Sequence, residues 1–148
     1  MRTFTITATL IFLVSVMISG CASNDVATGD NASASNTIVC EVFYRPTSGT
    51  SLEAAPEITF PGRNDQKFQE FEDMSFEARF QDDQFEGRAL MIVVTNLNTG
   101  TEISRQLYQF DSQNPLKNQF VGGHGFTGLN YVFHPDSSAE MQYFCSVK

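Results

Sequence analysis

Apolar and polar residues alternate with a period of two along much of the chain after residue 36, and this pattern restricts the fold more than any other feature. Residues 73–81 show it most clearly, with Met74, Phe76, Ala78 and Phe80 set between polar neighbours. A period of two is typical of strands that bury one face, whereas a helix requires a period near 3.6. The pattern therefore predicts an all-β domain.

The alternation predicts about eight strands between residues 37 and 148. They are expected over residues 37–45, 57–60, 73–81, 87–96, 101–110, 116–121, 129–134 and 141–147. No convincing helix is expected, and the nearest helical candidate is residues 65–72, where Phe68 and Phe71 lie three apart. Pro56 and Pro61 frame the segment 57–60 and indicate an edge strand. Strand number and spacing favour an antiparallel two-sheet sandwich, immunoglobulin-like or jelly-roll-like, over a closed barrel.

Composition agrees with one packed domain and argues against nucleic acid as a partner. The chain has 148 residues, of which 41% are apolar, and a net charge of −8. Removal of the first 20 residues would leave eight basic against 17 acidic residues, a net charge of −9. Phosphate binding needs a basic surface, which this balance does not supply.

Two of the three cysteines, Cys40 and Cys145, lie in the first and last expected strands. Each shares a face with apolar neighbours, so both are expected to point inward. They approach closely enough for a disulfide only if these strands run antiparallel, which an even number of strands provides. The alternative is a pair of reduced, buried thiols.

The third cysteine, Cys21, follows a basic residue at position 2 and an apolar segment over residues 4–18. The ending Ile18-Ser19-Gly20-Cys21 resembles the lipobox of bacterial lipoproteins, with an aliphatic residue, two small residues and a cysteine. The resemblance implies that residues 1–20 are a signal peptide, that Cys21 receives a diacylglyceryl group by thioether linkage, and that cleavage follows Gly20. It also implies an extracytoplasmic, lipid-anchored protein of the cell envelope, on the outer membrane if the cell has two membranes. An uncleaved membrane anchor or an ordinary secretory signal is the alternative.

Residues 21–36 are expected to form a lipidated cysteine and a flexible tether. They are small and mostly polar, with a single Val and no aromatic residue. Such a segment buries too little surface to fold by itself. The folded domain is therefore expected to span residues 37–148.

Acidic residues cluster in the loops that follow alternate expected strands. If every strand reverses direction, Asp82, Asp83, Asp111 and Asp136 meet at one end of the sandwich, with Glu86 beside them. Calcium binds six to eight oxygen ligands, often from such loops, so the sequence predicts a calcium site there. The simpler interpretation is that these aspartates cap turns on an acidic surface.

The segment 122–128, GGHGFTG, contains four glycines around His124. It lacks the lysine and the helix of a phosphate-binding loop. We therefore expect a bulged corner between strands with Phe126 in the core. A rigid recognition loop with His124 at its tip is an alternative, which makes His124 a candidate binding residue.

No motif for nucleophilic or zinc catalysis is present. Sugar binding on a sandwich face remains open, with Phe43 and Tyr108 as candidate stacking residues. Two hypotheses follow. The first is a non-enzymatic binding or assembly module, held at the membrane by Cys21, that recognises an envelope protein or glycan without a resident cofactor. The second is an envelope enzyme, or a calcium-dependent binding domain, with an acidic site near Asp82, Asp111 and Asp136.

Overall fold

The structure is a computed structural model that describes residues 37–61, 64–83, 87–111 and 114–148. Its elements are β1 (Ile38–Arg45), β2 (Glu53–Ala54), β3 (Ile58–Phe60), β4 (Asp65–Glu70), β5 (Met74–Asp83), β6 (Gly87–Asn96), β7 (Glu102–Phe110), the 3₁₀ turn η1 (Val121–Gly123), β8 (Asn130–Phe133) and β9 (Glu140–Val147). The described residues thus form an all-β domain, as the alternation predicts.

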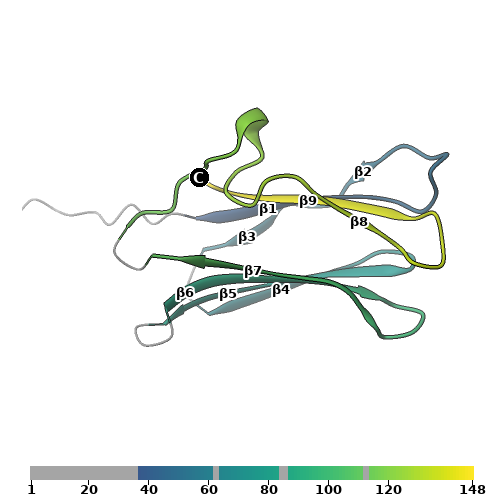
Figure 1. Cartoon of the computed structure of the whole chain (residues 1–148), viewed down its shortest axis with the longest axis horizontal. Helices are drawn as coiled ribbons and strands as arrows, with labels where there is room; N and C mark the ends of the chain where they lie inside the picture. Colours follow the sequence, from purple (N-terminus) through teal and green to yellow (C-terminus); the bar gives the residue numbers. More distant parts are fainter. Residues whose placement is uncertain (1–36, 62–63, 84–86, 112–113) are drawn as a thin grey trace, which may run out of the picture. The chain divides into compact units, whose positions relative to one another are not determined.

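The strands form two antiparallel sheets that pack face to face (Figure 1). The first has the order β2-β1-β9-β8, with β3 also paired to β1. The second is the meander β4-β5-β6-β7. The expected two-sheet antiparallel sandwich is confirmed.

The core lies between the sheets and contains the residues that the period of two assigns to inward faces. On β5 the buried apolar residues are Met74, Phe76, Ala78 and Phe80, and the polar Ser75 is buried as well. Phe76 contacts Tyr143 of β9 edge to face, with ring centroids 5.2 Å apart. This contact joins residues of the two sheets, so the inner faces of the sheets pack directly against each other.

Three segments differ from expectation, and the first is the two-residue strand β2, which the alternation did not predict. The helical candidate 65–72 forms β4 instead, which pairs residue by residue with β5 from Asp65 opposite Phe80 to Glu70 opposite Ser75. Its exposed and half-buried residues alternate as they do at a sheet edge, so strand pairing outweighs the spacing of the two phenylalanines. The expected strand 116–121 is absent, because the amides of Gln119 and Phe120 both donate to the Gly125 carbonyl and turn the chain back.

These differences explain why the first and last strands are antiparallel although nine strands are described. β2 and β3 both run antiparallel to β1, so they point in the same direction and act as one interrupted edge strand. The unexpected strand β4 adds one reversal of chain direction, and the absent strand at 116–121 removes one. The total number of reversals between β1 and β9 is therefore the number expected. The expected antiparallel pairing of β1 with β9 is therefore confirmed.

Candidate binding surfaces

Cys40 and Cys145 lie directly opposite each other on β1 and β9 and form a disulfide. Their Cα atoms are 4.0 Å apart, and both side chains are fully buried. The bridge joins residues 105 apart in sequence. The structure therefore agrees with the disulfide expected from the inward phase of both residues. Cys21, by contrast, lies outside the described residues.

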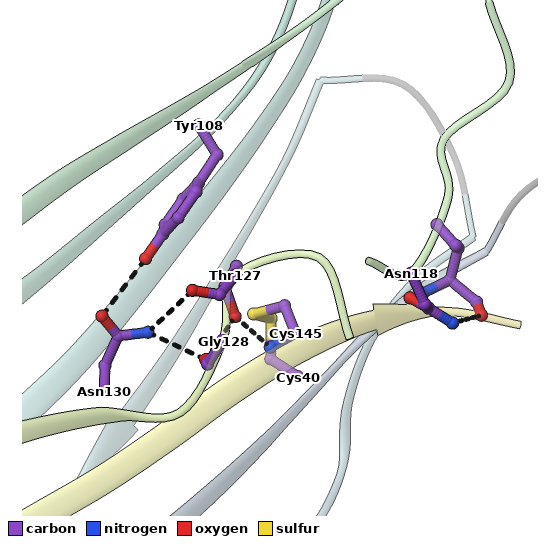
Figure 2. The surroundings of a disulfide bond; sticks show 8 residues. Cys40, Tyr108, Asn118, Thr127, Gly128, Asn130 and Cys145 are labelled. Carbon is purple, nitrogen blue, oxygen red and sulfur yellow. Dashed lines mark hydrogen bonds between the residues drawn. A yellow bond between two sulfur atoms is a disulfide. The ribbon is translucent and has the colours of Figure 1, made fainter. Parts of the chain in front are cut away.

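The glycine-rich segment is bonded to β9. The Phe126 amide donates to the Cys145 carbonyl (2.9 Å). The Cys145 amide donates to Thr127 Oγ1 (2.7 Å), as Figure 2 shows. Further along, the Asn118 side chain donates to the Val147 carbonyl (3.0 Å) and accepts from the Val147 amide (2.9 Å). These bonds replace the ladder that the short β8 does not supply.

Phe126 is buried in the core, as expected for a corner between strands. His124 is half-buried, and its ring packs against Phe144 with centroids 5.3 Å apart. The exposed tip of the segment is instead η1, where Val121 is 96% exposed. His124 therefore does not lie at the exposed tip, because its ring packs edge to face against Phe144 of β9.

The four aspartates predicted to bind calcium do not converge. Asp82 and Asp83 end β5, and Asp111 follows the end of β7, which runs parallel to β5 across β6. Asp136 lies in the turn between β8 and β9. Its neighbour Ser137 donates to Asp73 Oδ2 (2.8 Å), at the start of β5.

Asp73 and Asp83 thus mark opposite ends of the sandwich. The ten residues of β5 between these ends span about 30 Å of extended chain. Between Asp83 and Asp136 the structure has one strand fewer than expected, because residues 116–121 do not form a strand. The chain therefore reverses one time fewer, and Asp136 lies at the opposite end of the sandwich from the one expected. The four aspartates of the expected calcium site therefore do not form one cluster, and in the alternative acidic site Asp136 lies at the opposite end from Asp82 and Asp111. Glu86 lies outside the described residues.

The acidic groups that do share an end have local partners. Asp82 lies 3.5 Å from the Arg88 guanidinium, and Asp111 accepts from Asn114 Nδ2. Within the described part of the chain, no three His, Cys, Asp or Glu side chains are arranged to hold a metal ion. In the same residues, no helix is long and apolar enough to cross a membrane.

A groove of about 550 Å³ lies beside the second half of β7, and we call it the β7 groove. It is lined by residues 107–111, residues 114–117, Gln119 and Phe126. Its volume falls within the range of ordinary ligand sites. Two of its residues were candidates from the sequence, Tyr108 for sugar stacking and Asp111 for calcium binding, and the others were not predicted as site residues.

The floor of the β7 groove is apolar and its rim is polar. Phe126 is buried there and contacts Phe110 edge to face, with ring centroids 5.1 Å apart. Leu116 packs against the core from the opposite side. Gln109, Lys117 and Gln119 are exposed along the rim. An apolar floor with a few polar groups is what a binding site requires.

Tyr108 anchors this region to the other sheet rather than facing solvent. Its hydroxyl donates to Asn130 Oδ1 of β8 (3.4 Å), and Asn130 donates in turn to the carbonyls of Thr127 and Gly128 (Figure 2). Burial raises the pKa of Tyr108, and it also raises the pKa of the neighbouring Tyr143. The expectation of Tyr108 as an exposed stacking residue is wrong. Phe43 does lie on the outer face of the first sheet, but it is half-buried and stacks on Phe144.

Two exposed aromatic residues on β8 were missed in the sequence. Tyr131 and Phe133 are 54% and 62% exposed on the outer face of the first sheet, on either side of the buried Val132. The alternation in residues 129–134 contained this signal, because a strand with one buried face must turn its intervening residues outward.

Comparison with known proteins gives no match, whether with family models, curated proteins or solved structures. The function must therefore be argued from these surfaces and from the sequence.

Proposed function

We propose that this protein is a lipid-anchored binding module of the bacterial cell envelope, with Cys21 as the acylated residue and the β7 groove as its ligand site. The observation that carries the proposal is the ending Ile18-Ser19-Gly20-Cys21, followed by a polar tether and a disulfide-bonded sandwich. Disulfides persist in oxidising compartments outside the cytoplasm, so the bridge supports export. Acyl chains contribute about 0.8 kcal/mol per buried CH₂, so two or more of them support stable anchoring.

The groove supports a binding role rather than catalysis. Its residues include no nucleophile paired with a base, and its one carboxylate, Asp111, is bonded to Asn114. An apolar floor between polar rims suits recognition of a ligand side chain.

Cys21→Ser tests the anchoring part of this proposal. Without a thiol at the cleavage site, the protein should lose palmitate labelling and leave the detergent phase, when expressed in a bacterium that processes lipoproteins. Ser19→Ala is the matched control, because it keeps a small residue at the same site and should label as the wild type does. Equal labelling of Cys21→Ser would refute the lipid anchor.

A further inference from the structure

The sheet edges of the domain differ in how they are protected against pairing with another strand. Natural proteins block exposed edges with charges, prolines, short strands or covering loops. β4 carries Asp65, Lys67 and Glu70 along its length. β2 and β3 are short and flanked by Pro56 and Pro61. At the other edge of the first sheet, β8 is short. Beyond the end of β8, Asn118 and Thr127 form hydrogen bonds with β9.

The second half of β7 carries no charge or proline and is not a short strand, so it lacks the sequence features that protect the other edges. Among the described strands, β7 pairs only with β6, so its other side is an edge. Glu102 and Arg105 charge the first half and bond to each other, but residues 106–110 contain neither a charge nor a proline. Leu107 in this stretch is 58% exposed. The unprotected stretch lies alongside the β7 groove.

From this coincidence we propose that the β7 groove binds an extended peptide segment of a partner protein, which adds as a fifth strand to the sheet β4-β5-β6-β7. Main-chain hydrogen bonds to the edge supply affinity in this mode, and pockets for alternate side chains supply specificity. The stretch 106–110 spans about 17 Å, enough for five extended residues. An apolar or aromatic side chain of the peptide enters the groove over Phe126 and Leu116.

Residues 114–117 line the groove together with residues 107–111, so a peptide paired with the β7 edge would contact both stretches. The net charge of −8 disfavours an acidic peptide, so the ligand is neutral or basic. This inference rests on the proposed binding role and names its ligand class.

The test uses the full chain and a synthetic pool of seven-residue peptides, in which apolar or aromatic residues alternate with Thr and Lys. Saturable binding with a Kd below about 1 mM is expected for selected members, measured by fluorescence anisotropy. Each selected peptide is also made with N-methyl groups on either set of alternate amides. One methylated form should have a Kd at least tenfold higher than that of the unmodified peptide, and the other should have a Kd within threefold of it. The reason is that only one edge of the peptide forms hydrogen bonds with β7.

Leu107→Lys and Phe68→Lys form a matched pair of variants, since both side chains are exposed on edge strands of one sheet, 58% and 55% respectively. Leu107→Lys should weaken peptide binding at least tenfold, whereas Phe68→Lys should change it less than twofold. Unfolding curves of both variants establish that the fold is kept.

Four results would overturn the proposal. They are the absence of any saturable member, equal binding of both methylated forms, binding unaffected by Leu107→Lys, and self-association that Leu107→Lys abolishes. Binding lost in Phe133→Lys alone would place the ligand on the outer face of β8, as for a glycan stacked on aromatic rings, and would overturn it equally. Palmitate labelling of the same preparation reports anchoring separately, so failure of peptide binding is distinguishable from failure of the lipid anchor.

Discussion

Gly125 allows the closest approach between the glycine-rich segment and β9. Its φ is +62°, and a Cβ atom there would overlap the carbonyl oxygen of Cys145. The clash involves backbone on both sides, which cannot move aside as a flexible side chain would. Only glycine therefore lets the Phe126 amide reach Cys145 and bury the Phe126 ring beneath the β7 groove.

We expect Gly125→Ala to destabilise the protein by roughly 2–5 kcal/mol, the sum of backbone strain and overpacking. Urea unfolding followed by far-UV circular dichroism measures this loss. Gly123→Ala is the control, because Gly123 also has a positive φ of +82° but open space around it. It should cost about 1–2 kcal/mol, from strain alone. Equal losses in the two variants would contradict the close contact with Cys145.

At the scale of elements, β1 and β9 are held in register by more than their backbone ladder. Arg45 and Glu140 are directly opposite, and the guanidinium donates to Glu140 through Nε (3.0 Å) and NH2. Gln142 donates to the other carboxylate oxygen. The Glu140 carboxylate is thus buried but paired on both oxygens, which offsets its desolvation.

Glu140→Gln should destabilise the protein by roughly 1–3 kcal/mol at pH 7, the range for hydrogen bonds to a charged group. The hydrogen bond from Gln142, followed by that from Arg45, lowers the pKa of Glu140 below its ordinary value. A lowered folded-state pKa contributes stability that is fully present above the unfolded pKa of about 4.3. That contribution is lost as the pH falls through the folded-state pKa.

The difference between wild type and Glu140→Gln should therefore shrink as the pH is lowered from 7 to below 4, in melting temperatures taken at constant ionic strength. Glu53→Gln is the control, because Glu53 is exposed on β2 beside the same strand β1. It should show no such trend. A pH-independent difference for Glu140→Gln would mean that the ionised carboxylate is not the stabilising form.

For the whole molecule, the disulfide determines how far the chain can unfold. It links the first and last long strands, so nearly the entire domain lies within the closed loop of 105 residues. In the chain-entropy account, a loop of this size stabilises the folded state by about 4.7 kcal/mol.

Cys40→Ala combined with Cys145→Ala should therefore lower the free energy of unfolding by up to about 4.7 kcal/mol, measured by urea titration. In the wild type, both cysteines should resist alkylation in denaturant without reductant, as followed by mass spectrometry. Cys21→Ser is the control and should leave both residues blocked. Recovery of both as alkylated thiols from the exported protein would exclude the bridge.

The sequence by itself determined the fold class and the inward faces, because burial of one side of a strand imposes a period of two that is visible in β1, β5 and β9. It also placed Cys40 and Cys145 on those faces. The local sequence pattern did not predict the correct secondary structure at β4 and at residues 116–121. The polar β4 is a strand because β5 pairs with it, and 116–121 is not a strand because Gly125 and β9 take its hydrogen bonds.

Only the tertiary structure decided which groups meet at a site. Asp136 separates from Asp82, Asp83 and Asp111 because the end at which a loop falls depends on every reversal of the chain before it, so one wrongly assigned strand moves it to the opposite end. The β7 groove likewise depends on β7 lying at a sheet edge and on residues 114–119 facing it. Neither fact has a local signal here, since no proline frames β7 as Pro56 and Pro61 frame β3.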